Sequence, residues 1–221
     1  MDSSVFFSMR LSLQVASTAT LLVVLAGTFI AYFLARRDFR GKELLDVLFT
    51  LPLVMPPTVT GYYLIVLFGR RGIIGGPLFE LTGWTVMFTW QAAVLASFTV
   101  ALPLMIKTTR AAIESVDRNL INASSTLGHA EAETAFKVIL PLAKRGIIAG
   151  TVLSFARAMG EFGATLMLAG NIPGKTDTMP LALYSLAGSG EWSGAQGMVI
   201  LLTALSGFFL YLANRYAKRV I

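Results

Sequence analysis

The sequence of 221 residues contains no cysteine and one histidine, His129. Without cysteine there can be no disulfide framework, no thiol nucleophile and no cysteine-based zinc site. A single histidine excludes a metal site built from several imidazoles. We therefore expect no metal ion bound by this chain.

Charged residues are also scarce, at 14% of the chain, against about 25% in soluble domains. Hydrophobic residues make up 55%, and the mean hydropathy is +0.71. Four long stretches lack Asp, Glu, Lys and Arg altogether: 11–35, 47–69, 81–106 and 192–214. Each is long enough to cross the roughly 30 Å of hydrocarbon in a bilayer, which takes about 20 helical residues.

A fifth apolar stretch, about 146–169, carries only Arg157 and Glu161. Backbone groups in hydrocarbon must all be hydrogen-bonded internally, so these stretches should be helices. We predict an all-α integral membrane protein with about five transmembrane helices, forming one domain over 1–221 with its core at about 11–214. The expected spans are 11–35, 47–69, 84–106, 146–169 and 192–214. The first is expected to remain as an anchor instead of being removed as a signal peptide.

The basic residues favour one orientation. Of the 18 Lys and Arg, thirteen fall in 36–42, 107–145 and 215–219, and four fall in the alternate connections. Cytoplasmic loops carry the excess of Lys and Arg, so the N-terminus should lie outside and the C-terminus in the cytoplasm. The net charge of +6 then reflects topology and gives no reason to expect a nucleic-acid partner.

One short run imitates a nucleotide-binding motif. Ala169 to Thr176 reads A-G-N-I-P-G-K-T, which resembles a loose phosphate loop. A true phosphate loop joins a strand to a helix. This run instead follows a membrane span, is expected outside the cell, and is followed by Pro180, in an outer loop with a short helix near Leu181–Leu186. We expect a turn here, with no cofactor bound.

The second span is rich in proline, with the sequence T-L-P-L-V-M-P-P-T-V-T-G from Thr50 to Gly61. Proline cannot donate a backbone hydrogen bond and bends a helix. Such breaks are tolerated where the freed carbonyls face protein or a water-filled cavity. The span is either a kinked packing helix or part of a permeation pathway, and the pathway candidates are Pro56, Pro57, Thr58, Thr60 and Gly61.

Arg157 and Glu161 are the charged pair within the fourth span. Ionisable groups at membrane depth are costly and are functional candidates by default. Four residues apart, the two lie on one helix face and can pair. They form either a structural ion pair or part of a gate, with Gly160, Gly163 and Thr165 as neighbouring pathway candidates. We find no nucleophile beside a base and so no catalytic residues.

The segment 107–145 is the longest predicted cytoplasmic connection, and we expect it to be helical, with a break at Gly128 and a short helix that restarts over 131–138. Residues 121–141 read I-N-A-S-S-T-L-G-H-A-E-A-E-T-A-F-K-V-I-L-P. This run resembles the cytoplasmic signature of binding-protein-dependent ABC importer permeases, although Asn122 replaces its glutamate, Ser124 its second alanine and Val138 its isoleucine. The resemblance implies a type I importer permease (MetI-like) architecture and a short helix that docks on an ATPase subunit. The implied coupling residues are Asn122, Ala123, Ser124, Leu127, Gly128, Leu140 and Pro141.

A narrower resemblance covers nearly the whole chain. The runs 51–62, 68–72 and 155–176 are similar to molybdate permeases and to the related sulfate and thiosulfate permeases. That family implies a homodimer in the bacterial or archaeal inner membrane, two cytoplasmic ATPase subunits that use the ATP, and an external substrate-binding protein. Molybdate is the expected cargo, with sulfate, thiosulfate or tungstate as alternatives. The rival class is a self-contained channel or secondary transporter; such carriers often show internal repeats, and none is visible here.

Overall fold

The computed structural model describes residues 3–217, and every regular element in that range is helical. The elements in chain order are α1 (Ser3–Arg36), α2 (Lys42–Val54), α3 (Pro57–Phe68), α4 (Gly75–Thr82), α5 (Trp90–Glu114), α6 (Arg118–Thr126), α7 (Glu131–Thr134), the π-helix η1 (Ala135–Ile139), α8 (Leu140–Met159), α9 (Gly163–Ala169), α10 (Met179–Gly188) and α11 (Trp192–Ala217).

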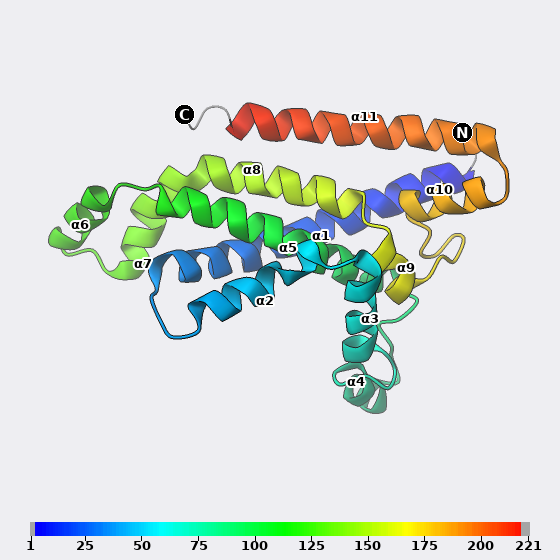
Figure 1. Ribbon diagram of the computed structural model, residues 1–221, viewed down its shortest axis with the longest axis horizontal. Helices are drawn as coiled ribbons and strands as arrows, with labels where there is room; N and C mark the ends of the chain where they lie inside the picture. The colour runs from blue at the N-terminus through cyan, green and yellow to red at the C-terminus, as the bar shows by residue number, and fades with distance from the viewer. Residues whose placement is uncertain (1–2, 218–221) are drawn as a thin grey trace.

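Four long helices, α1, α5, α8 and α11, run side by side along the longest axis of the molecule (Figure 1). Each is long and apolar enough to cross a membrane, and the bent pair α2–α3 makes a fifth span if it is counted as one. The prediction of an all-α membrane protein with about five spans is confirmed.

Small side chains allow α1, α5 and α8 to approach closely. Ala16, Ala19, Ala96 and Ala101 have no exposed surface. Gly27 is equally tight, because a Cβ there would lie 2.7 Å from Cγ of Met105. Helices in lipid associate through van der Waals contact between small residues, since burial from water offers little driving force there.

The proline-rich second span is not one kinked helix but two helices, α2 and α3, separated by a sharp bend. The axes of α2 and α3 differ by 118°. Pro56 and Pro57 end one helix and begin the next, since neither has an N–H to donate and Pro57 occupies the first turn of α3. As a result α3 points away from the long helices, and α4 lies at its far end (Figure 1).

The stretch 146–169, expected as one span, is divided. Helix α8 begins earlier, at Leu140, and ends at Met159; α9 follows after three residues. The predicted third span is 84–106, but its helix, α5, covers Trp90–Glu114. The helix therefore extends beyond the C-terminal end of the uncharged stretch.

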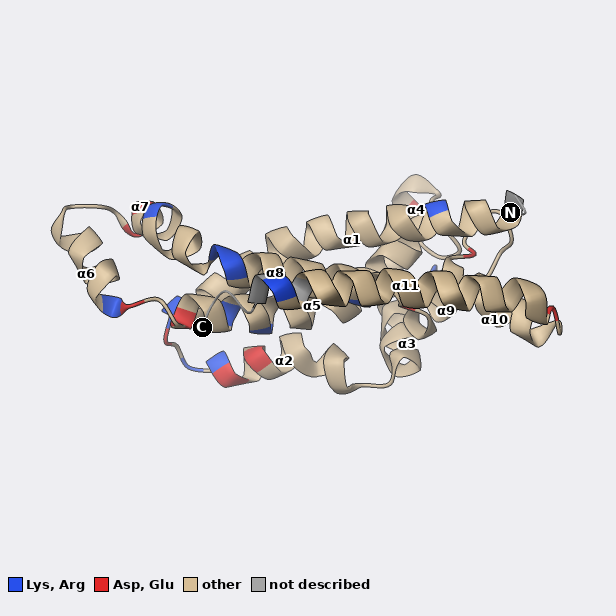
Figure 2. Ribbon diagram, turned by 90° about the horizontal axis from the view of Figure 1, so that it is seen from above, with Lys and Arg blue, Asp and Glu red and all other residues tan. Residues whose placement is uncertain are grey.

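Most of the charged residues in the described part of the chain lie toward the end of the bundle that carries α6 and α7 (Figure 2). Arg37 forms an ion pair with Glu131 at 2.7 Å, and Asp46 of α2 lies 2.9 Å from the ammonium of Lys107 on α5. In the connection before α2, the Lys42 ammonium beside Asp38 lowers the pKa of that carboxyl. This is the end that the count of basic residues places in the cytoplasm; two of the counted residues, Lys218 and Arg219, lie outside the described range.

Candidate functional site

Residues 117–134 fold into a compact projection at the charged end of the bundle, which we call the knob (Figure 1). Asp117 starts α6 by accepting a hydrogen bond from the backbone N–H of Asn119 at 2.8 Å, a favourable arrangement at a helix N-terminus. The helix ends at Thr126, and two residues later Gly128 has a φ of +85°, in the left-handed region that favours glycine. The chain then reverses into α7.

A small hydroxyl cluster fixes the two halves of the knob to each other. Oγ of Ser124 lies 2.9 Å from Oγ1 of Thr134 and 3.2 Å from Nδ1 of His129. Ser124 and Thr134 are both 4% exposed. Buried polar groups that are hydrogen-bonded to one another specify one arrangement, because separating them would leave unsatisfied groups.

The knob is also anchored to the bundle by apolar contacts. Ile121 packs in a buried cluster with Ile113, Val116, Ile139 and Ala143. The knob is therefore continuous with the ends of α5 and α8, so a displacement of the knob would be passed to both helices.

The predicted coupling residues divide between the surface and the interior. Asn122, Ala123, Leu127 and Gly128 are exposed, and Leu127 is 78% exposed. Ser124 instead faces inward and belongs to the hydroxyl cluster. Leu127 is therefore an exposed apolar side chain near the tip of the knob.

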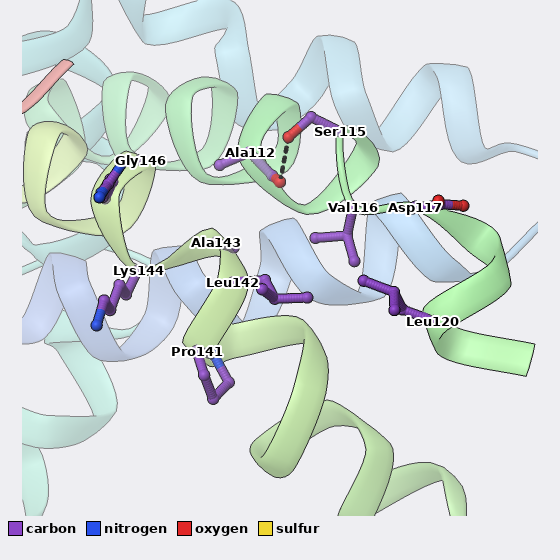
Figure 3. A pocket seen from close by; sticks show the side chains of 11 residues that line it. Ala112, Ser115, Val116, Asp117, Leu120, Pro141, Leu142, Ala143, Lys144 and Gly146 are labelled. Atoms are coloured by element: carbon purple, nitrogen blue, oxygen red, sulfur yellow. Dashed lines mark hydrogen bonds between the residues drawn. The ribbon is translucent and has the colours of Figure 1, made fainter. Parts of the chain in front are cut away.

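Leu140 and Pro141 lie apart from the tip, in the first turn of α8. Pro141 has no N–H to donate to the carbonyl of Lys137, and the turn before it is the π-helix η1. Pro141 lines a groove of about 480 Å³ that runs between the ends of α5, α6 and α8 (Figure 3).

Sequence reasoning missed the residues around this groove. Leu120 and Leu142 line it and are 49% and 53% exposed, and Lys144 lies beside them. It also missed His129 and Thr134 as positioning residues. A periodic apolar pattern could have indicated that Leu120 lies on one face of a helix. No sequence signal predicts that Thr134 lies next to Ser124.

The two sets of candidate pathway residues, separated by about a hundred residues, meet where α3 packs on α9. A Cβ on Gly61 would lie 2.6 Å from Cβ of Met167, and one on Gly163 would lie 2.7 Å from Cβ of Pro57. Both glycines therefore bring the backbones together, which any larger side chain would prevent.

Arg157 and Glu161 form the expected pair, with Nη1 and Oε2 2.8 Å apart. The Glu161 side chain is 1% exposed and that of Arg157 30%. Oε1 of Glu161 also accepts a hydrogen bond from the backbone N–H of Ala164 at 2.8 Å. The carboxylate thus satisfies the first turn of α9 and joins it to the last turn of α8.

Two threonine hydroxyls near this contact have no hydrogen-bond partner among residues 3–217. Thr60 of α3 is 2% exposed and Thr165 of α9 is 1% exposed. A buried hydroxyl without a partner is costly. Such hydroxyls are free to form hydrogen bonds with a polar ligand that binds transiently. Pro56, Thr58 and Gly160 are exposed on neighbouring turns.

The phosphate-loop-like run lies at the opposite end of the bundle from the knob. Thr176 is fully buried, and its Oγ1 accepts from the N–H of Ile172 at 3.0 Å and donates to the carbonyl of Gly170 at 3.4 Å. Its hydroxyl is committed to the turn itself. Within the described residues no three His, Asp or Glu side chains gather as metal ligands.

Comparison with known proteins defines the class. Residues 24–221 match the family described as the binding-protein-dependent transport system inner membrane component. The chain belongs to this family and is a multi-pass inner-membrane protein.

Particular relatives narrow the comparison. The chain is 46% identical over 209 residues to the molybdenum transport system permease protein ModB of Escherichia coli (strain K12), covering 94% of this chain and 91% of that protein. It is 39% identical to ModB of Haemophilus influenzae, over 96% of this chain and 95% of that one. A probable sulfate transport system permease protein of Chlorella vulgaris is 36% identical, over 93% and 77%.

Solved structures support the fold. A chain of the MetNI methionine ABC transporter, inward facing, superposes with a TM-score of 0.75 at 15% identity, covering all of both chains. A chain of a bacterial alginate ABC transporter, in complex with an alginate pentasaccharide-bound periplasmic protein, gives 0.78 at 14% identity, over 100% of this chain and 80% of that one. The predicted type I importer architecture is confirmed.

Proposed function

We propose that this chain is the channel-forming subunit of an ATP-driven importer of molybdate, and that two copies form the pathway. The observation that carries the cargo is the 46% identity to a molybdenum transport permease over nearly the full length of both chains. ATP is bound and hydrolysed by two cytoplasmic partner subunits, and an external binding protein delivers the anion.

The energetics require a coupled machine. Molybdate is a dianion, and moving two negative charges into a cell that is negative inside costs about 4–5 kcal/mol per 100 mV. Each tenfold concentration gradient adds about 1.4 kcal/mol. Passive flow through a channel cannot supply this free energy, whereas ATP hydrolysis by a partner can.

The knob is the proposed connection to the ATPase. Its tip, at Ala123, Leu127 and Gly128, docks on the ATPase subunit, and the groove lined by Leu120 and Pro141 extends that contact. Closure of the ATPase dimer on ATP moves the knob, and the cluster around Ile121 passes the movement to α5 and α8. Coupling by rigid-body motion between packed units is common in switching proteins.

The pathway is proposed to run past the contact between α3 and α9. The hydroxyls of Thr60 and Thr165 can donate to the oxygens of a passing oxyanion, while the Arg157 charge is largely neutralised by Glu161. Weak sites of this kind favour conduction, because a fixed unpaired cation would retain a dianion.

Sulfate is the second candidate cargo, and the relative named as a sulfate permease, 36% identical, favours it. The test is uptake by proteoliposomes that contain this chain, its ATPase and its binding protein, with labelled molybdate or labelled sulfate outside. Accumulation of molybdate that requires ATP supports the proposal. Preferential accumulation of sulfate overturns the cargo, and uptake without ATP or ATPase overturns the importer in favour of a secondary transporter.

A further inference from the structure

A cavity of about 200 Å³ lies at the end of the bundle opposite the knob. It is lined by the beginning of α1, the turn after α9, helix α10 and the first turns of α11 (Figure 1). With the predicted orientation, this cavity lies on the outer side of the membrane, where the binding protein must arrive. None of the pathway or coupling residues lines it.

A buried carboxylate lines this cavity. Asp177 is 7% exposed, and its Oδ2 accepts a hydrogen bond of 3.2 Å from Oγ of Ser8. Its Oδ1 is buried and has no hydrogen-bond partner among residues 3–217. Among residues 3–217, no lysine or arginine lines the cavity. An ionised carboxylate removed from water without a paired charge is costly, so this group is incomplete as it stands.

The walls of the cavity indicate the chemistry of the missing partner. Val5, Pro173, Leu186 and Met198 supply apolar surface. Ca²⁺ or Mg²⁺ would instead require about six oxygen ligands, and within the described part of the chain Asp177 is the one carboxylate that lines the cavity. An apolar wall that ends in a carboxylate is complementary to a lysine side chain, whose aliphatic stem lies along apolar surface while its ammonium reaches the charge.

The frame of the cavity is already fixed in the absence of any partner. Oγ of Ser12 accepts a hydrogen bond from the N–H of Met179 at 2.7 Å, which attaches the start of α10 to α1. Nδ2 of Asn171 donates to the carbonyl of Leu181 at 3.3 Å and to Oγ of Ser185 at 2.6 Å. A site ordered before binding loses little conformational entropy when its partner arrives.

We propose that this cavity is a socket for a lysine side chain of the external binding protein, and that Asp177 is the residue that anchors it. The inference rests on the proposed function, because it assumes a binding protein that docks on the outer end. It adds to the proposed function the residue, Asp177, whose negative charge holds the binding protein in place.

The test uses the whole importer in liposomes, with ATPase activity measured against the concentration of purified, molybdate-loaded binding protein. Asp177→Asn removes the charge and keeps the shape. Glu191→Gln is the matched control, because Glu191 is an exposed outer carboxylate in the turn between α10 and α11 that does not line the cavity. We expect Asp177→Asn to raise the half-saturating concentration at least about tenfold with an unchanged maximal rate, since removing one member of a buried charge pair is expensive. Glu191→Gln should leave both values unchanged.

A second measurement does not depend on the variant folding. Acetylation of the binding protein's lysines removes their charge, whereas dimethylation retains it. Acetylation should weaken docking on the wild-type importer, and dimethylation should not. The inference is overturned if acetylated protein docks normally, or if Asp177→Asn lowers the melting temperature and maximal rate while the half-saturating concentration stays the same. A wild-type importer that ignores its binding protein altogether would instead overturn the proposed function.

Discussion

Glu161 is the residue whose two carboxylate oxygens join separate parts of the broken fourth span. One oxygen pairs with Arg157 in the last turn of α8, and the other accepts the N–H of Ala164 in α9. Its side chain is 1% exposed, so neither contact can be replaced by water. The pair therefore stabilises the break between α8 and α9.

Replacement of Glu161 by glutamine should destabilise the protein. The amide can still accept from Ala164, but Arg157 loses its charge partner and stays partly buried. We expect the free energy of unfolding to fall by about 1–3 kcal/mol, measured as a lower melting temperature in detergent. The double variant Arg157→Gln with Glu161→Gln should recover part of the loss. If the single variant is as stable as wild type, the pair does not hold the break.

Gly61 and Gly163 form the close contact between α3 and α9. Gly61→Ala places a Cβ 2.6 Å from Cβ of Met167, so overpacking should cost about 1–3 kcal/mol and reduce transport. Gly207→Ala is the control, because a Cβ at that helical position meets nothing within 4 Å. Its melting temperature should be unchanged or slightly higher, because alanine favours helix by up to about 1 kcal/mol. Equal melting temperatures for the two variants would contradict the close packing.

At the scale of elements, the knob depends on a reversal at Gly128. No atom lies within 4 Å of the position where its Cβ would be, so the cost of substitution comes from the positive φ alone. Asparagine tolerates this conformation better than other residues, and valine is strongly disfavoured there.

Gly128→Asn should therefore retain most of the binding-protein-stimulated ATPase activity of the importer, and Gly128→Val should lose most of it. The ATPase subunit should also co-purify poorly with the valine variant. Transport by Gly128→Val at the wild-type rate would show that the reversal is not needed for coupling.

Much of the element order could be predicted from the sequence, because lipid imposes a simple rule. Segments of about 20 residues without charge have few alternatives to a helix. The proline cluster likewise predicts a break near Pro56 and Pro57. The bend of 118° could not be predicted, since two prolines remove hydrogen bonds but do not fix the direction in which the next helix leaves.

The candidate site could be predicted only in part from the sequence. Helical spacing predicted that Arg157 and Glu161 would pair, because partners four residues apart share a helix face. Spacing could not reveal the end of α8 at Met159, nor the contact of Gly61 with Met167 of α9. Those features depend on packing between distant segments. The signature run predicts that Ser124 lies on the docking surface, yet its side chain faces the interior of the knob.

At the scale of the whole molecule, the distribution of charge predicts the topology. The charged end carries the knob, and the opposite end carries the turn between α10 and α11 (Figure 2). Because the chain contains no cysteine, this orientation can be tested with single substitutions and no background.

Ser189→Cys and Ser125→Cys place one exposed thiol at each end of the molecule. In intact spheroplasts, a membrane-impermeant maleimide should label the Ser189 variant only. After permeabilisation it should label both. Labelling of only the Ser125 variant in intact spheroplasts would show the opposite topology. The knob would then lie outside the cell, where it could not contact a cytoplasmic ATPase.

The central claim is that this chain couples an external molybdate-binding protein to ATP hydrolysis inside the cell. The most direct test is the ATPase rate of the complete importer in liposomes, with its binding protein added empty, loaded with molybdate or loaded with sulfate. The account predicts strong stimulation by the molybdate-loaded protein and little by the other two. Equal or greater stimulation by sulfate would contradict the cargo, and an ATPase that neither associates nor responds would contradict the importer itself.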